Sequence, residues 1–532
     1  MTRYRGRIGA GLALAALIAG LIVALLWTLF SASGANPGTG AAARDIGALL
    51  VGNVVQAGLS TVVSIAAGLA IAWALDRVAF PGREAFVAIL STGLVLPALV
   101  VAFGVVAIWG RGGWINDALA PFGLELPFTI FGLQGIVLCH LILNGALAAR
   151  IFYNRLATLS PQRLKLGRSL ALPPLERFRA IDWPALQGVL PGLSAVIFLF
   201  CFTSFAIVLT LGGGPRNATF EVAIFESVRL DFDPGLAARL ALIQLALCLL
   251  IILPAAGWPL GAQRIARASP AWHWPDRGPV RLLQVSLILL AGFGFFLPLA
   301  AILAGGTTPE AFGILASPAF LAALLTSVAI ATASAALAIA LALVLGLARA
   351  NVALTGGGTG LRLAINAPAF AYLATPAVVL SLGFFLLARG AGISPALAAP
   401  PVIVLANALL ALPLAAAIVG PPLERLSART AKLQRSLALS GLTRFREIEL
   451  PLIRTDLGYA AAVAFCLSLG DLGVIALFGT ADFATLPWLM YRAMGAYRSA
   501  DAAVIAASLF ALTLVAFLII PKLIGGGRHA DA

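Results

Sequence analysis

Long stretches without charge constrain this chain more than any other feature of its sequence. Predominantly apolar runs, each near the roughly 20 residues that cross a bilayer, recur from residue 9 to residue 520. Only 11% of the residues are charged and 61% are hydrophobic, whereas soluble domains carry roughly one quarter charged residues. The sequence therefore excludes a water-soluble enzyme and indicates a polytopic membrane protein that lies in a lipid bilayer.

Reading these runs as helices gives about twelve membrane spans, because backbone polar groups in hydrocarbon must be satisfied within the span itself. The fold class that we expect is all-α. The predicted spans are 9–30, 47–75, 85–109, 130–149, 188–212, 236–260, 281–304, 320–348, 368–388, 400–420, 457–478 and 500–520.

The first run has two interpretations. Arg3, Arg5 and Arg7 precede it, and Ser31-Ala32-Ser33 resembles a signal-peptidase site. Because the run is longer than the core of about 7–15 residues typical of a cleaved signal, we expect a retained helix, with cleavage as the alternative. Most of the 35 Lys and Arg residues fall in segments that are cytoplasmic if the N-terminus is inside. This distribution predicts that both termini are cytoplasmic.

Several chemistries are not expected. The net charge of +14 lies in short loops between spans, where orientation signals belong, so we expect no nucleic-acid partner. We expect no metal, no cofactor and no catalytic residues, because the cysteines lack C-x-x-C spacing and the histidines are scattered. A P-loop needs Gly-Lys before Ser or Thr, but each of the three lysines follows another residue. Any ATPase must therefore be a separate subunit.

An internal repeat determines the architecture. Residues 168–184 and 435–451 are identical at 11 of 17 positions without a gap. Six spans lie between the copies, so both copies face the same side and the two six-helix halves are parallel repeats. A weaker similarity relates Pro97-Ala98 and Gly104 to Pro376-Ala377 and Gly383. We expect a first helix with an external loop (1–46), a first repeat (47–260), a linker with the seventh span (261–319), a second repeat (320–520) and a cytoplasmic tail (521–532).

We call residues 160–184 the first repeated segment and residues 427–451 the second repeated segment. Each is expected to form a short helix, a break and a second helical stretch. Leu166 and Leu170, like Leu433 and Leu437, are four residues apart and share a helix face. Such an apolar edge fits a groove on a partner protein. An interfacial helix resting on lipid headgroups is the alternative.

The repeated segments resemble the cytoplasmic loop of ABC importer permeases, whose pattern is Glu-Ala-Ala, three residues, Gly, nine residues, Ile-x-Leu-Pro. Ala171 and Ala438 stand at the Gly position, and residues 165–167 and 432–434 depart from Glu-Ala-Ala. The resemblance assigns ATPase coupling to Arg168, Ser169, Leu170, Ala171, Ile181, Pro184, Arg435, Ser436, Leu437, Ala438, Ile448 and Pro451.

Longer stretches resemble the fused two-half permease of the bacterial thiamine importer. They include residues 96–114, Leu211-Gly212-Gly213-Gly214-Pro215 and Gly470-Asp471-Leu472-Gly473. The resemblance implies a type I importer permease in the bacterial inner membrane, with two copies of a cytoplasmic ATP-binding subunit, an external substrate-binding protein and a thiamine-type substrate. Related permeases for iron(III), sulfate or polyamines share this frame. From the residues alone, an ion-coupled secondary transporter also remains open.

Polar side chains inside spans are candidates for the substrate path, because burying them in a bilayer is costly. Asp471 lies between glycines in the eleventh span, and Ser204 matches it in the first half. His140 and Asn144 lie in the fourth span, and Asn407 matches His140. A carboxylate on the path would favour a cation. Interhelical hydrogen bonding is the alternative for these residues.

Overall fold

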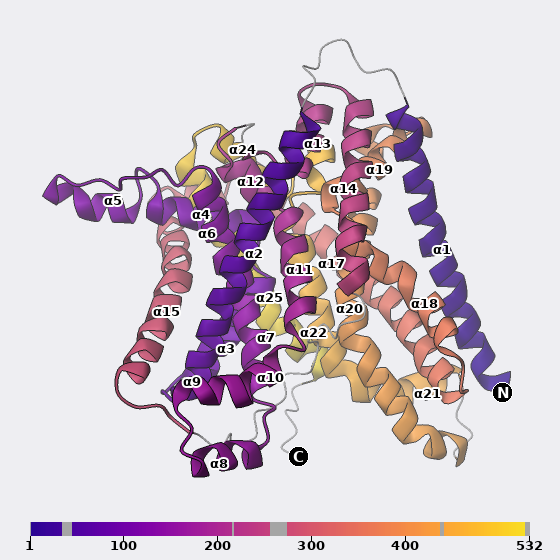
Figure 1. Cartoon of the computed structure of the whole chain (residues 1–532). Coiled ribbons are helices and arrows are strands. Elements are labelled where there is room, and N and C mark those ends of the chain that lie inside the picture. Colours follow the sequence, from indigo (N-terminus) through magenta and orange to yellow (C-terminus); the bar gives the residue numbers. More distant parts are fainter. Residues whose placement is uncertain (1, 35–44, 215–216, 256–273, 437–440, 527–532) are drawn as a thin grey trace. The chain divides into compact units, whose positions relative to one another are not determined.

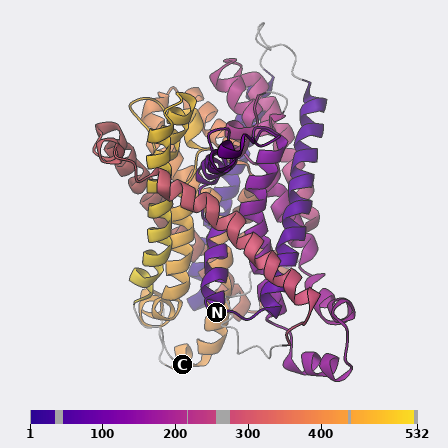
Figure 2. The same cartoon turned by 90° about the vertical axis from the view of Figure 1, so that its left-hand side faces the viewer.

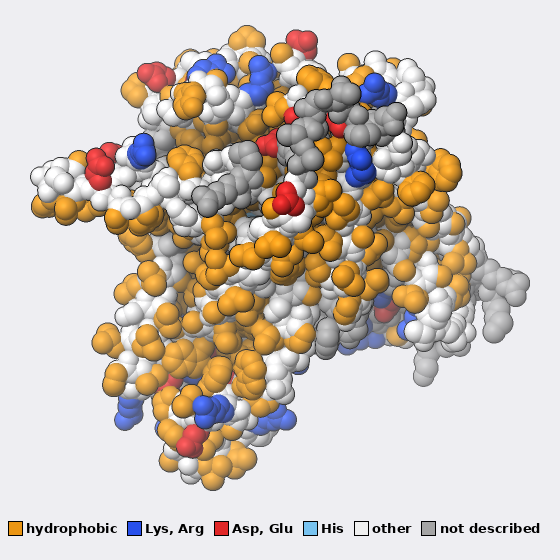
Figure 3. Space-filling model, turned by 45° about the horizontal axis from the view of Figure 1, so that its top comes forward, with side chains coloured by type: hydrophobic (Ala, Val, Ile, Leu, Met, Phe, Trp, Pro, Cys, Tyr) orange, Lys and Arg blue, Asp and Glu red, His pale blue; other side chains and the backbone are white. Residues whose placement is uncertain are grey.

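The structure, a computed structural model, describes residues 2–34, 45–214, 217–255, 274–436 and 441–526. Every regular element within these residues is helical (Figure 1). Among the described residues, ten helices are long and apolar enough to cross a membrane, and two bent helix pairs bring the number of spans up to 12. On the face shown in Figure 3, hydrophobic side chains cover much of the surface. The expected all-α polytopic fold is confirmed.

The chain divides into two compact bodies, which are described separately. The C-terminal body comprises Met1–Ala43, Ala223–Ala246 and Glu310–Ala532. The N-terminal body comprises Arg44–Val222 and Leu247–Pro309. The first helix, α1 (Thr2–Ser33), thus belongs to the C-terminal body, and the seventh span, α15 (Pro279–Gly305), belongs to the N-terminal body. Each half of the sequence contributes its first helix to the body built mainly from the other half.

Small residues let the helices of the N-terminal body approach closely. The long helix α2 (Ile46–Arg77) packs against α6 (Leu133–His140), α7 (Ala146–Leu156) and α11 (Leu190–Phe202). A Cβ at Gly68 would overlap Ala148 of α7. Close backbone approach at small residues is the usual way in which helices associate in bilayers.

Helix α15 crosses the N-terminal body obliquely (Figure 2). It packs on α2 and on α4 (Ala98–Trp109). The closest approach is at Gly104, where a Cβ would lie 2.9 Å from the Pro298 carbonyl oxygen and 2.8 Å from Ile302 Cδ1. Because the carbonyl is part of the backbone and moves little, glycine is the residue that fits this crossing.

The C-terminal body is built around four long helices, which pack on one another. They are α17 (Pro318–Leu354), α20 (Pro395–Ser436), α22 (Leu450–Leu469) and α25 (Ser499–Gly525). Helix α1 packs on α17, where a Cβ at Gly11 would overlap Ala348. It also packs on α19 (Ala377–Gly390), where a Cβ at Gly383 would lie 3.1 Å from Leu25 Cδ2. The weak sequence similarity relates Gly104 to Gly383. Each is a point at which the first helix of the other half of the sequence packs, α15 at Gly104 and α1 at Gly383.

Two spans expected to be continuous are broken at matching prolines. The third span consists of α3 (Arg83–Leu90), η1 (Ser91–Leu94) and α4, which begins after Pro97. The ninth consists of α18 (Thr359–Ala371), η6 (Tyr372–Ala374) and α19, which begins after Pro376, and the chain bends there by 103°. Proline lacks an N–H and clashes with the preceding turn, so a helix cannot continue through it unperturbed.

The fifth and eleventh spans also break at matching places. Helix α11 ends at Phe202 and the short α12 (Ala206–Leu211) follows, while α22 ends at Leu469 and α23 (Ile475–Phe478) follows. On the chain beyond these breaks lie α13 (Phe220–Arg229) with α14 (Pro234–Ala255), and α24 (Leu486–Gly495) with α25. The order of elements in residues 46–255 thus recurs in residues 318–525.

Candidate functional site

The first repeated segment forms four short helical pieces. They are α8 (Pro161–Ser169), α9 (Pro174–Arg177), the π turn η4 (Phe178–Asp182) and α10 (Trp183–Leu186). The Ser160 hydroxyl accepts a hydrogen bond from the Arg163 N–H and caps α8, and Pro161 occupies the first helical position. After α8, Ala171 has φ 50°, a left-handed conformation that favours glycine. The chain thus adopts at Ala171 a backbone that suits the glycine of the importer pattern.

The second repeated segment differs at its start. The helix expected over 432–439 is not separate, because α20 continues from the tenth span to Ser436. The segment resumes with α21 (Gly441–Arg444) and the π turn η7 (Phe445–Glu449), which leads into α22. Leu437 and Ala438 lie outside the described residues, as does the side chain of Arg435.

The two π turns stand at the same place in the repeat and end on matching carboxylates, Asp182 and Glu449. Both side chains are fully buried. A π turn inserts an extra residue into a helix and is frequent at functional sites. The repeat therefore preserves a local helix defect together with a buried acid.

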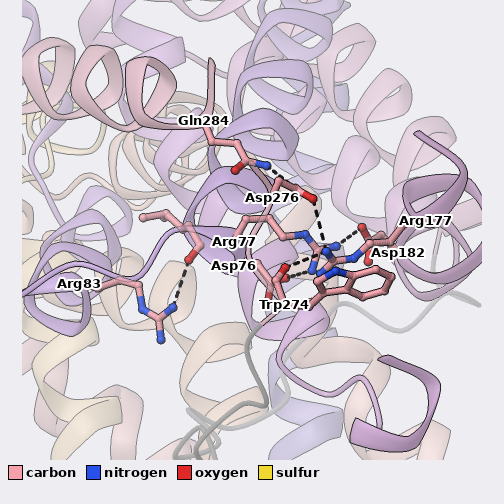
Figure 4. A network of polar contacts seen from close by, with 9 residues as sticks. Asp76, Arg77, Arg83, Arg177, Asp182, Trp274, Asp276 and Gln284 are labelled. Atoms are coloured by element: carbon pink, nitrogen blue, oxygen red, sulfur yellow. Dashed lines mark hydrogen bonds and ion pairs between the residues drawn. The ribbon is translucent and has the colours of Figure 1, made fainter. Parts of the chain in front are cut away.

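In the N-terminal body, a network of charges surrounds Asp182 (Figure 4). Arg77, at the end of α2, donates a hydrogen bond to Asp182 and another to Asp76 at 2.7 Å. Arg177 of α9 donates to the Trp274 carbonyl oxygen at 2.8 Å and lies 3.5 Å from an Asp276 oxygen. Arg77 and Arg177 are almost fully buried, so these charges require partners.

In the C-terminal body, Glu449 is bound by two arginines. Arg7 of α1 donates to both Glu449 oxygens at 2.9 Å and to the Gly441 carbonyl oxygen at 2.8 Å. The Arg444 Nε lies 2.7 Å from Glu449 Oε1. Near the end of α17, Arg349 instead pairs with Glu424 of α20, at 2.6 Å.

Apolar side chains of the repeated segments are exposed. Leu166, Leu170 and Leu175 are 61%, 63% and 60% exposed, and Leu442, which matches Leu175, is 61% exposed. Other residues that the resemblance assigns to coupling are also exposed: Arg168, Ser169, Ala171, Pro184, Ser436 and Pro451. The matched pair Ile181 and Ile448 is buried instead, and anchors each π turn. The first segment presents an apolar edge at Leu166 and Leu170, as the leucine spacing predicts, whereas the side chains of Leu433 and Leu437 lie outside the described residues.

In each body, one asparagine among the candidate path residues bonds to a residue near the break in the fifth or eleventh span. In the N-terminal body, Asn144 donates to Cys201 at 3.3 Å, three residues before Ser204. In the C-terminal body, Asn407 donates to Ser468 at 2.9 Å, three residues before Asp471. Cys201 and Ser468 match in the repeat. In the first half the fourth span is therefore bonded to the end of the fifth, and in the second half the tenth span is bonded to the end of the eleventh.

His140 and Asp471 have clear partners. The His140 Nδ1 lies 3.0 Å from Ser60 Oγ and 3.1 Å from Gln56 Nε2, and the histidine is buried. The Asp471 carboxylate accepts hydrogen bonds from the backbone N–H groups of Gly473 and Val474, at 3.2 and 3.0 Å. These contacts support a structural role, and they leave a role in the substrate path as a hypothesis.

One candidate was not singled out by sequence reasoning. Arg229, at the end of α13, donates to the Ala476 carbonyl oxygen at 3.0 Å and also to that of Gly479. Its guanidinium lies 5.4 Å from the Trp488 ring centroid, and burial lowers its pKa from the usual value. This arginine braces the loop after α23. Its only sequence signal is a charge after a short amphipathic helix.

The described residues contain no group of three or more His, Cys, Asp or Glu side chains that could hold a metal ion. No family model matches the chain. The thiamine transport system permease protein ThiP of Salmonella typhimurium is 36% identical over 487 residues, covering 89% of this chain and 88% of that protein. ThiP of Escherichia coli (strain K12) is 36% identical over 489 residues, with coverage of 90% and 89%. ThiP of Brucella melitensis is 36% identical over 480 residues, with coverage of 89% and 87%.

Proposed function

Because the chain belongs to the family of thiamine transport system permease proteins, we propose that it is the membrane-spanning subunit of an ATP-driven, binding-protein-dependent importer for thiamine or its phosphate esters. The similarity along nine tenths of the chain carries this proposal. The two copies of the importer segment, with their matched π turns, support it.

ATP hydrolysis belongs to partner subunits in this proposal. Two copies of a cytoplasmic ATP-binding subunit dock on the first and second repeated segments, where exposed leucines such as Leu170 and Leu442 supply the apolar edge. An external binding protein delivers the substrate at the opposite side. Both termini are cytoplasmic, and the protein spans the bacterial inner membrane many times, with α1 retained.

We assign to the substrate path the polar groups at the break of the fifth span in the N-terminal body and those at the break of the eleventh span in the C-terminal body, and the transporter alternates between inward and outward openings. Thiamine carries a fixed positive thiazolium, and Asp471 is a carboxylate at one of these breaks. Its two backbone hydrogen bonds hold the carboxylate in place. Asn144, Ser204, Asn407 and His140 complete the polar groups that we assign to this region.

The test is purification of the chain with its ATP-binding subunits, followed by uptake of thiamine into vesicles in the presence of the binding protein. We expect uptake to require ATP and to fall when Leu170→Ser and Leu442→Ser are combined, because the docking edge loses apolar area. Leu124→Ser, an exposed leucine after α5 (Trp114–Leu119), is the matched control. Uptake driven by an ion gradient without ATP would contradict the proposal and favour a secondary transporter.

A further inference from the structure

The first helix of each half begins beside the repeated segment of the other half. In the C-terminal body this helix is α1, whose Arg7 binds both the π turn at Glu449 and the start of α21 at the Gly441 carbonyl. The Glu449 side chain is fully buried and that of Arg7 is 19% exposed. The Glu449 carboxylate is out of contact with water, so loss of Arg7 would leave a buried charge with one partner fewer.

In the N-terminal body the corresponding helix is α15, and the residues just before it make the contact (Figure 4). The Arg177 guanidinium lies 4.0 Å from the Trp274 ring centroid, bonds the Trp274 carbonyl and pairs with Asp276. Gln284, one of the buried residues of α15, donates to Asp276 at 2.7 Å. The aspartate is therefore tied both to the repeated segment and to α15 itself.

The same tryptophan also touches the other part of the first repeated segment. A Cβ at Gly167 of α8 would lie 3.0 Å from the Trp274 ring and 2.6 Å from Ile181 Cδ1. The indole is thus close to both α8 and α9, and the close packing at Gly167 leaves no room for a side chain there. Movement of the first repeated segment must carry residues 274–276 with it or break these contacts.

Each repeated segment carries a matched arginine and a matched carboxylate, and the two contacts are made by different members of this pair. Arg177 matches Arg444, and Asp182 matches Glu449. In the N-terminal body Asp182 is already paired with Arg77, so Arg177 is the residue that contacts Asp276, just before α15. In the C-terminal body Glu449 makes the contact instead, because the charge on α1, that of Arg7, is positive.

We propose that these two contacts, the α15 ion pair (Arg177–Asp276) and the α1 ion pair (Arg7–Glu449), transmit movement of each repeated segment to the first helix that packs on the same body. Arg7 and Asp276 are positioning residues that act through the segments. The proposal rests on the proposed coupling function, because the movement originates in ATP-binding subunits docked on the segments.

The experiment compares Arg7→Gln, Asp276→Asn and the two together in the full transporter with its ATP-binding subunits and binding protein. We expect the subunits to co-purify as with the unaltered chain, and transport per ATP hydrolysed to fall about five- to tenfold in each single variant. Arg7→Lys retains the charge and restores most of the ratio. Arg7→Gln causes a smaller loss when added to Glu449→Gln than when made in the unaltered chain, because the Arg7–Glu449 ion pair is already gone and only the hydrogen bond to the Gly441 carbonyl remains to be lost.

Hydrogen exchange in the full chain gives a second measurement that does not depend on transport. Arg7→Gln should speed amide exchange in residues 441–449 and Asp276→Asn in residues 174–182, each without affecting the other segment. Arg281→Gln on α15 and Glu310→Gln before α16 (Ala311–Leu315) are exposed charge-removal controls and should change neither readout. An unchanged transport-to-ATP ratio in a co-purifying complex, or unchanged exchange, overturns this inference. Failure of the unaltered chain to bind the ATP-binding subunits overturns the proposed function instead.

Discussion

Asp182 and Glu449 stand at the same position of two repeated π turns, and each is bound by an arginine from a different helix of its own body. Arg77 of α2 binds Asp182, whereas Arg7 of α1 binds Glu449. The repeat thus preserves the buried acid and changes its partner. A buried carboxylate tolerates such a change only if another cation reaches it, because an unpaired buried charge is strongly destabilising.

The first prediction concerns the pair Arg77 and Asp182. Asp182→Asn leaves a buried guanidinium short of its partner and should lower the free energy of unfolding by about 2–3 kcal/mol, because hydrogen bonds to charged groups are the costly ones to lose. Arg77→Met combined with Asp182→Leu should recover most of that loss, since neither member of this pair is then a buried charge. Unfolding in mixed micelles measures both values. A double variant less stable than Asp182→Asn would show that the pair is worth more than its desolvation cost.

The second prediction concerns the left-handed residue after α8. Ala171→Gly should raise the free energy of unfolding by about 0.5–1 kcal/mol, because a left-handed alanine costs roughly 1–2 kcal/mol and glycine loses part of that gain through its freer unfolded chain. Ala180→Gly, in the helical η4 turn, is the control and should destabilise by a similar amount. Local stability from hydrogen exchange of residues 161–182 measures both. A destabilising Ala171→Gly would contradict the strain.

The third prediction compares Gly104, on which α15 packs, with Gly383, on which α1 packs. Gly104→Ala should cost about 1–3 kcal/mol, because the new methyl group meets the Pro298 backbone carbonyl. Gly383→Ala should cost less than about 1 kcal/mol, because only the flexible Leu25 side chain must move. Thermal unfolding of the purified variants shows which substitution destabilises the protein more. Equal costs would mean that the α15 crossing adjusts as easily as the α1 crossing.

The fourth prediction concerns Asp471. Asp471→Asn keeps an oxygen that accepts from the Val474 N–H, so membrane insertion and stability should change by less than about 1 kcal/mol. Thiamine uptake should fall about tenfold or more, because the carboxylate that favours a cation is lost. Ser508→Ala, which removes a hydrogen bond within α25 of the same body, is the structural control and should leave uptake unchanged. Normal uptake by a correctly inserted Asp471→Asn protein would assign the carboxylate to loop structure alone.

Local signals predict much of the fold. Apolar runs locate the spans, and the repeat at residues 168 and 435 locates the two segments in matching positions. Both depend on residues near one another in the chain. The prolines at 97 and 376 were visible as well, but their effect was underestimated, because a proline in a membrane helix is often accommodated by its neighbours. Here they end one helix and begin the next.

Contacts between distant residues were beyond the sequence. Nothing in the run 9–30 indicates that Gly11 packs against Ala348, and nothing around Asp276 indicates Arg177. The π turns were also missed, since their residues have ordinary helical patterns. The path candidates were found because intramembrane polar residues are rare, but their grouping through Cys201 and Ser468 required the structure.

The packing of α1 on α17 and α19 has a consequence for how the protein is made. Helix α1 is synthesised long before α17 and α19, so the surface on which it packs exists only after residues 318–390 have been made, and its Arg7–Glu449 ion pair only after residue 449. Until then α1 lacks the helices of the C-terminal body on which it packs. Assembly of the C-terminal body is therefore a late event, and a chain that stops after the sixth span would leave its first helix without its own partners.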